Sequence, residues 1–312
     1  MEFRLSEEQG LLRRTVRAFA ESEIRPHVLE WDEAQHFPIE LIPKLAKLGL
    51  LGIEISEEYG GAGLTALDYC ICIEELARVC PAVALSVAAH NGLCAAHIFR
   101  VGTEAQKRRF LTPLARGEWI GAWALTEASS GSDASNMRTT ASLDGTDWVI
   151  NGSKVFTTHG RVGHVVVVMA VNDRSLGRKG ISAFIVEKSA PGISAGKKEN
   201  KLGMRASDTS ELIFDNCRVP AAQLLGKEGH GFVDALAVLD TGRIGIAALS
   251  VGLAQGAHEA ALNYAHERVA FGKPIASFEA IQWKLADNAT GIEASRLLTY
   301  RAALSEIGRA HV

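Results

Sequence analysis

The spacing of hydrophobic and polar positions along the chain changes twice, and these changes divide it into three parts. Up to about residue 118, apolar residues recur every three to four positions, the period of amphipathic helices. From Trp119 to about Val219, the apolar runs are short and β-branched, and glycine, asparagine or aspartate separates them, as in strands joined by turns. The helical period then returns. We therefore predict a helical domain over residues 1–118, a β domain over 119–228 and a second helical domain over 229–312.

Signals for individual helices and strands support this division. Ser6 with Gln9, and Thr103 with Gln106, form capping boxes, and each predicts the start of a helix. The continuous apolar run at 164–171 predicts a buried strand, and the whole middle segment predicts six to eight strands. Strands do not alternate with helices along the chain, which argues against a doubly wound nucleotide-binding fold.

Composition narrows the class of protein. The net charge is −3 and both signs are mixed along the chain, which argues against a nucleic-acid partner or a basic membrane-binding face. The most apolar region, residues 81–99, contains His90, Asn91 and His97, so we expect a buried helix there and no membrane span. The N-terminus shows no secretory signal. Five cysteines without a CxxC pair indicate reduced thiols, and we expect a cytoplasmic protein.

One loop combines features that suit a ligand. In the stretch WALTEASSGSD, residues 123–133, an apolar strand ends in hydroxyl residues and a glycine. A turn through Ser129 to Ser132 would point several backbone N–H groups outward, and Gly131 permits positive φ and close approach of a ligand. Such a loop suits a pyrophosphate or the polar edge of a flavin ring. Taken alone, it is more typical of a β-turn with hydroxyl caps.

The loop is one of five stretches in which the chain resembles the acyl-CoA dehydrogenase family, and the five follow the family's order. They are residues 49–63, 123–133, 150–160, 202–220 and 267–282. The resemblance implies an α+β multidomain fold with an N-terminal helical domain, a middle antiparallel β-barrel-like domain and a C-terminal helical bundle. It also implies FAD as the cofactor and an acyl-CoA thioester as the substrate.

The resemblance assigns roles to individual residues. Phe156 would cover one face of the flavin, Thr158 would hydrogen-bond near its N5 atom, and Arg268 would reach the FAD of a neighbouring subunit. Core packing is the alternative for Phe156. The full set of expected cofactor-binding residues is Trp123, Leu125, Thr126, Gly131, Ser132, Phe156, Thr157, Thr158, Arg268 and Phe271.

The acyl-CoA would be bound by Ser132, Asp240 and Arg243, of which the last two lie one helical turn apart. A local ion pair is the alternative for Asp240 and Arg243. No metal is implied.

The family's catalytic carboxylate has no counterpart in this chain. Its usual position lies beyond the last residue, and some relatives instead place it on the long helix, at the position of Gly242 here. Glu127 and Asp133 are poor substitutes because both belong to the flavin loop. We therefore expect a C-terminally truncated and inactive chain with an incomplete helical bundle. Residues 306–312 back-translate to the start of a common sequencing adapter, and our hypothesis is that they are non-native.

The reaction implied by the resemblance is flavin-dependent α,β-dehydrogenation of an acyl-CoA to the trans-2-enoyl-CoA. Electrons would pass to an electron-transfer flavoprotein. The complete protein would be a homotetramer or homodimer of fatty-acid or branched-chain acyl-CoA metabolism. Two alternatives stay open: a non-catalytic flavin- or acyl-CoA-binding protein, and an oxygen-reactive relative such as an oxidase or monooxygenase.

Overall fold

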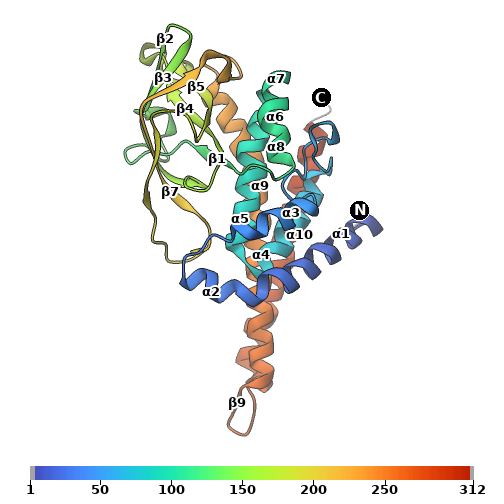
Figure 1. Ribbon diagram of the computed structural model, residues 1–312. Coiled ribbons are helices and arrows are strands. Elements are labelled where there is room, and N and C mark those ends of the chain that lie inside the picture. Colours follow the sequence, from blue (N-terminus) through green and yellow to red (C-terminus); the bar gives the residue numbers. More distant parts are fainter. Residues whose placement is uncertain (1–3, 310–312) are drawn as a thin grey trace. The chain divides into compact units, whose positions relative to one another are not determined.

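The computed structural model describes residues 4–309, with side chains up to Ser305. Of the residues predicted to be non-native, 310–312 lie outside the described residues. The described chain forms two compact units, and each unit is built from segments that are separate in the sequence (Figure 1).

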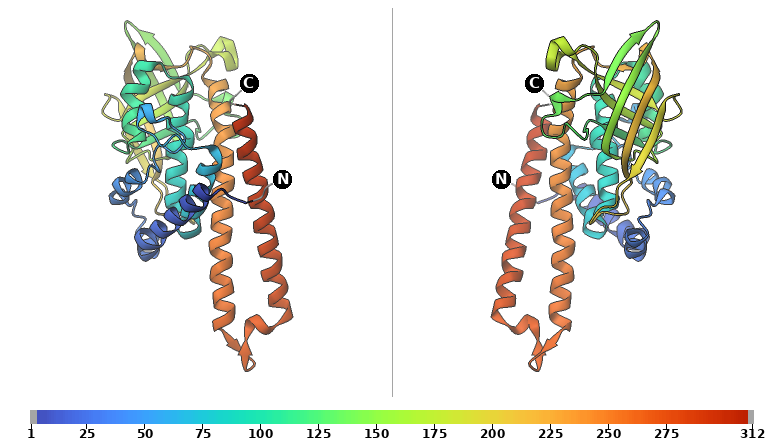
Figure 2. Two further views of the ribbon diagram at one scale, coloured as in Figure 1. Left: turned by 90° about the vertical axis from the view of Figure 1, so that its right-hand side faces the viewer. Right: turned by 90° about the vertical axis from the view of Figure 1, so that its left-hand side faces the viewer.

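The first unit is helical and contains residues 4–29, 65–85 and 243–309. The capping box predicted at Ser6 and Gln9 is present at the start of its first helix. Its elements are α1 (Glu7–Phe19), η1 (Ala20–Ile24), η2 (Arg25–His27), α4 (Ala66–Val79), most of α9 (Gly231–Glu267), β9 (Val269–Ala270), β10 (Lys273–Pro274), η10 (Ile275–Ser277) and α10 (Glu279–Arg309). Figure 2 shows α9 and α10 as two long helices joined by the short turn between β9 and β10.

Helix α9 approaches α4 at glycines. A Cβ atom added to Gly245 would lie less than 3.0 Å from the Tyr69 hydroxyl. One added to Gly252 or Gly256 would lie equally close to a backbone carbonyl oxygen of α4. Because backbone atoms of a packed helix cannot move aside, glycine at these two positions allows the two helices to lie in contact.

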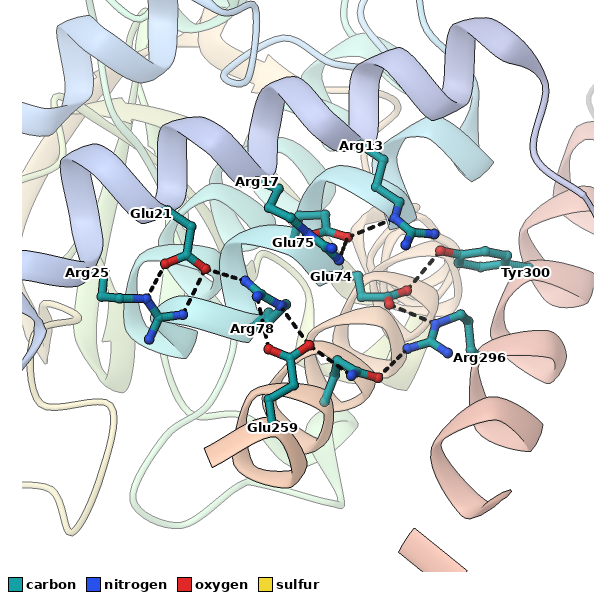
Figure 3. Close-up of polar contacts among 11 residues, drawn as sticks. Arg13, Arg17, Glu21, Arg25, Glu74, Glu75, Arg78, Glu259, Arg296 and Tyr300 are labelled. Atoms are coloured by element: carbon teal, nitrogen blue, oxygen red, sulfur yellow. Dashed lines mark hydrogen bonds and ion pairs between the residues drawn. The ribbon is translucent and has the colours of Figure 1, made fainter. Parts of the chain in front are cut away.

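Ion pairs link α4 to three other helices of the first unit (Figure 3). Glu74 and Glu75 are adjacent and buried, and their carboxylates bind different partners. Glu75 accepts hydrogen bonds from Arg17 of α1 at 2.7 and 2.8 Å, whereas Glu74 accepts one from Arg296 of α10 at 2.8 Å. Arg78 reaches Glu259 of α9 at 2.9 Å. A buried charge is costly unless it is paired, so these contacts favour one register for each helix on α4.

The second unit contains residues 30–64 and 86–242 and holds a sheet packed against short helices. The capping box predicted at Thr103 and Gln106 is present. The helical elements are η3 (Ile39–Leu41), α3 (Ile42–Lys47), η4 (Glu57–Tyr59), η5 (His90–Ala95), α6 (Ala96–Val101), α7 (Glu104–Gln106), η6 (Lys107–Leu111), α8 (Thr112–Ala115), η7 (Ala134–Asn136), η8 (Arg174–Gly180) and η9 (Ala221–Gln223). Helices α2 (Val28–Glu33) and α5 (Pro81–Ala89) each continue from one unit into the other.

The sheet of the second unit has eight strands in the order β6-β7-β3-β2-β4-β5-β8, with β1 paired to β4. The strands are β1 (Gly121–Ala124), β2 (Thr140–Asp144), β3 (Asp147–Thr158), β4 (Val165–Val171), β5 (Ile181–Glu187), β6 (Ile193–Lys198), β7 (Thr209–Pro220) and β8 (Leu224–Leu225).

The helical, β and helical order of the predicted fold is confirmed, but the barrel-like middle domain is corrected. The sheet is open, with β6 and β8 at its ends, and β4 pairs in parallel with both β1 and β2. Short β-branched runs look the same in an open sheet and in a barrel. Closure depends on whether the two end strands pair, and a local pattern does not contain that information.

Strand β4 is buried on both faces, which explains its unbroken apolar sequence. Val165, Val167 and Met169 pack with Ile98 and Phe110 in one core. The alternate residues of β4 belong to a second core, which contains Trp148 and Phe214. All five cysteines are buried and free.

Two helices are long and apolar enough to cross a membrane, judged by length and composition alone. They are the continuous helical run Pro81–Val101 and α9. Of the apolar window in the first, 78% is buried inside the protein, as in a core helix. Core helices of this kind pass the same test, so these two helices are weak evidence for a membrane span.

Candidate functional site

A small cavity of about 130 Å³ lies in the second unit, where the π-helical segment η5 meets β1 and β3. π-Helical segments occur often at functional sites. Five of the predicted cofactor-binding residues line the cavity: Trp123, Leu125, Thr126, Phe156 and Thr158. The other lining residues are Ala89, Leu93, Gly121 and Val155.

Phe156 has an unusual backbone conformation. Its φ angle is +57°, a region that bulky residues rarely adopt, and its side chain is 63% exposed. The pairing of β3 with β7 shifts by one residue between Lys154 and Thr157, so Phe156 lies on a β-bulge. Bulges redirect side chains near functional sites, and backbone strain tends to occur there. No local sequence pattern predicts this conformation.

The loop after β1 is fixed by a tight turn. The N–H and carbonyl groups of Glu127 and Ser130 exchange hydrogen bonds of 2.9 and 3.1 Å, and the Ser130 hydroxyl donates to the Asp133 carbonyl at 2.7 Å. Gly131 and Ser132 follow and are exposed. Gly131 is outside the positive-φ region, and nothing lies within 4 Å of a Cβ atom built there. Gly131 therefore leaves open space beside the loop, and its φ angle does not require glycine.

Behind this loop, Glu127 and Lys154 form a buried ion pair of 2.8 Å. Burial lowers the pKa of Lys154 to about 8, although the negative charge of Glu127 opposes this. Burial alone would raise the pKa of Glu127, but the Lys154 charge and several hydrogen bonds hold it below its usual value. The Glu127 carboxylate is therefore engaged in the structure of the loop. Asp133 is exposed and accepts from the Ser135 hydroxyl at 3.0 Å.

Two buried histidines accept hydrogen bonds from β1, a role that the sequence alone does not indicate. The Gly121 N–H donates to His90 Nδ1 at 3.1 Å, and Trp123 Nε1 donates to His97 Nδ1 at 3.1 Å. Both imidazoles accept at Nδ1 and are therefore neutral. Burial lowers the pKa of each to about 4. The only signal in the sequence was two histidines within an otherwise apolar helix.

The remaining predicted residues do not line the cavity. Thr157 is buried, and its hydroxyl has no hydrogen-bond partner in the described part of the chain. Asp240 and Arg243 are exposed on α9. Arg268 and Phe271 are exposed in the first unit, in and next to the turn that joins α9 to α10.

The cavity wall suits a flat heteroaromatic ring. Its surface combines apolar groups with two aromatic side chains, Trp123 and Phe156. The hydroxyls of Thr126 and Thr158 make no hydrogen bond to protein within residues 4–305, so both are available to a ligand. A volume of about 130 Å³ admits one end of a ring system and not a whole dinucleotide. The residues present thus fit the edge of an isoalloxazine ring.

Three family descriptions match consecutive parts of the chain. They are "Acyl-CoA dehydrogenase, N-terminal domain" over residues 6–118, "Acyl-CoA dehydrogenase, middle domain" over 122–217 and "Acyl-CoA dehydrogenase, C-terminal domain" over 229–308.

Individual relatives agree with these matches. The chain is 48% identical over 303 residues to a short-chain specific acyl-CoA dehydrogenase of Clostridium acetobutylicum, covering 97% of this chain and 80% of the relative. The solved structure of butyryl-CoA dehydrogenase from Megasphaera elsdenii matches with a TM-score of 0.95 and 42% identity, covering 98% of this chain and 81% of the other. A chain from a structure described as the electron transferring flavoprotein of Acidaminococcus fermentans matches with a TM-score of 0.97 and 46% identity, covering 98% and 80%.

Proposed function

This chain belongs to the acyl-CoA dehydrogenase family, and on that premise we propose that it oxidises a short-chain acyl-CoA to the trans-2-enoyl-CoA. The observation that carries the proposal is the convergence of five flavin-signature residues on one cavity, with Phe156 held on a bulge. The relatives named for short-chain acyl-CoA and butyryl-CoA support the substrate class. The match to a structure described as an electron transferring flavoprotein supports such a flavoprotein as the electron acceptor.

The cavity residues would hold FAD by complementary surfaces. When bound, FAD supplies the two-electron acceptor for the hydride that leaves the β-carbon of the substrate. Trp123, Leu125 and Phe156 would pack against the ring, and the free hydroxyls of Thr126 and Thr158 would hydrogen-bond its polar edge. Thr157 stays a predicted contact, although its hydroxyl is buried and does not line the cavity.

The substrate and neighbouring subunits would use exposed residues. Ser132 and Gly131, in the open loop after β1, would lie beside the acyl-CoA and the flavin. Asp240 and Arg243 would contact the CoA part, and Arg268 with Phe271 would reach the FAD of a neighbouring subunit in a homotetramer or homodimer. Large exposed apolar side chains on α9, α10 and their connecting turn support such assembly, since exposed apolar patches favour interfaces: Tyr264, Phe271, Trp283 and Leu298. The five free thiols support a cytoplasmic location.

Dehydrogenation also requires a proton acceptor. The α-proton of a thioester is weakly acidic, and the carboxylate that removes it needs a pKa raised by burial. None of the nine cavity-lining residues is a carboxylate, and Glu127 is held by Lys154. This observation favours a second candidate function: a protein that binds flavin and acyl-CoA without oxidising the substrate.

Anaerobic titration of the FAD-loaded chain with butyryl-CoA tests the proposal. Dehydrogenase function predicts loss of the flavin absorbance and formation of crotonyl-CoA, with reoxidation by electron-transfer flavoprotein and not by air. A spectral shift without loss of absorbance supports the second candidate. Butyrate with free CoA is the control, because it lacks the thioester. A flavin spectrum that no acyl-CoA perturbs would contradict both functions.

A further inference from the structure

Lys154 is fully buried, yet it does not line the cavity. Its ammonium group donates to the Leu125 carbonyl at 3.0 Å and to Glu127 Oε1 at 2.8 Å. Both acceptors belong to the loop after β1, 29 and 27 residues earlier in the chain. The Lys154 side chain therefore connects β3 to the loop after β1, and both segments contribute residues to the cavity wall.

Glu127 extends this link to a third segment. Its Oε1 atom accepts from the Thr139 N–H at 2.9 Å, and its Oε2 atom accepts from the Arg138 N–H at 2.6 Å. One carboxylate thus joins the loop, the two residues that precede β2, and Lys154. Buried charged groups with several hydrogen bonds have little freedom to move, so the position of the loop is closely defined.

The residues after Lys154 continue the connection to the cavity. The Val155 N–H donates to the Thr126 carbonyl at 2.9 Å, which fixes the main chain of the loop to β3. Phe156 follows at positive φ, and its ring lines the cavity. Three successive residues of β3 therefore act on the loop and the cavity. Lys154 binds the loop through its side chain, Val155 binds it through the main chain, and Phe156 lines the cavity.

Stability alone does not explain a charged pair in this place. Replacing a buried ion pair by apolar residues of similar size is often neutral or stabilising, because the two charges no longer lose their hydration. An apolar pair could not form the directed hydrogen bonds to the Leu125 carbonyl and to the Arg138 and Thr139 N–H groups. These hydrogen bonds determine the geometry of the loop.

We propose that Lys154 is a positioning residue, which acts through Glu127 and the Leu125 carbonyl to hold Leu125, Thr126 and Phe156 at the separation that a bound flavin requires. The inference rests on the proposed function for the identity of the ligand. It assigns Lys154 no contact with the flavin or the substrate.

The deciding variant is the double substitution Lys154→Met with Glu127→Leu, because it removes both charges together and leaves neither unpaired. We expect its thermal midpoint without ligand to fall, because the Arg138 and Thr139 N–H groups lose their acceptor. We expect FAD affinity to fall about tenfold or more and the absorption maximum of the bound flavin to shift, since the directed hydrogen bonds are lost. A purely structural role predicts that the folded double variant binds FAD with the wild-type affinity and an unshifted spectrum.

Lys201→Met is the matched control. Lys201 is a partly buried lysine of the second unit, and it donates to the Ser207 carbonyl at 2.6 Å instead of to the loop after β1. Its loss should lower stability and leave the flavin spectrum unchanged. Lys154→Arg decides the question if the double variant does not fold. It keeps the charge but cannot place one nitrogen atom between the same two acceptors, so a weakened and shifted flavin spectrum is expected.

Two outcomes overturn the inference in different ways. A wild-type chain that binds FAD, together with a folded double variant or Lys154→Arg variant of equal affinity and spectrum, overturns the role of Lys154 alone. A wild-type chain that binds no FAD overturns the proposed function and this inference with it.

Discussion

Gly242 of α9 lies against Leu93 of η5. A Cβ atom at residue 242 would be 3.3 Å from the Leu93 Cδ2 atom and 3.8 Å from the Gly92 carbonyl oxygen. Leu93 itself lines the cavity. A side chain at residue 242 would thus begin beside one residue of the cavity wall, and it would first meet the movable end of that leucine. By the resemblance described above, this is the position at which some relatives carry the catalytic glutamate.

Gly242→Glu should therefore place a proton acceptor beside the cavity. We expect the bound flavin to be reduced by butyryl-CoA about a hundredfold faster or more, the usual contribution of a general base. Anaerobic stopped-flow absorbance measures this rate. Gly242→Gln is the matched control, since it has nearly the same shape but cannot accept the proton. Equal rates in the two variants would show that residue 242 does not face the reacting carbon.

Replacing Phe156 separates backbone strain from ring contact. Phe156→Ala keeps a Cβ atom at φ +57°, whereas Phe156→Gly removes it. We expect the glycine variant to be more stable than the alanine variant, with an unfolding free energy about 1 kcal/mol higher. The reason is that strained non-glycine conformations cost roughly 1–3 kcal/mol. Urea unfolding of the flavin-free chain measures the difference. Both variants should bind FAD more weakly than the wild type, and equal stability of the two would argue against strain at this bulge.

The buried histidines make the protein sensitive to acid. The pKa of His97 is lowered from 6.5 to about 4, so between these pH values the unfolded chain holds a proton that the folded chain does not. Stability therefore falls as the pH falls through this window, by about 1.4 kcal/mol per pH unit for each such histidine. His97→Gln keeps an acceptor for Trp123 and should remove one such contribution. An unchanged pH dependence of the urea unfolding free energy would rule out titration of His97 as a cause.

Two glycines of the long helices should respond to alanine in opposite directions. A Cβ atom at Gly252 would overlap the Glu74 carbonyl of α4, whereas nothing lies within 4 Å of one at Gly291 of α10. We expect Gly252→Ala to destabilise the chain by about 1–3 kcal/mol through overpacking. Gly291→Ala should stabilise it by about 0.4–1 kcal/mol, because alanine has less backbone freedom when unfolded. Thermal melts compare the two, and a Gly252→Ala variant as stable as the wild type would contradict the close approach of α9 and α4.

Features encoded by neighbouring residues were predicted from the sequence. The capping boxes at Ser6 and Thr103 depend on residues three positions apart, and both are present. The order of helical and β segments follows from local period in the same way. The stretches that resemble the family contain all five of the predicted residues that line the cavity.

Features that depend on distant residues were not predicted. The Lys154–Glu127 pair joins residues 27 positions apart, and a lysine within a strand is normally expected to be exposed. The open sheet depends on which end strands pair, and the positive φ of Phe156 depends on a register shift against β7. His90 and His97 acquire their roles only when β1 is laid across the helix that contains them. Tertiary contacts determine each of these features, and local propensity does not.

Equilibrium titration of the purified chain with FAD tests the central claim most directly. Trp123 and Phe156 line the cavity, so a bound isoalloxazine should quench tryptophan fluorescence and show a resolved, shifted visible spectrum. Phe156→Ala should weaken both signals in parallel. A chain that stays colourless after removal of excess FAD, with unchanged tryptophan fluorescence, would contradict the assignment of this cavity to a flavin.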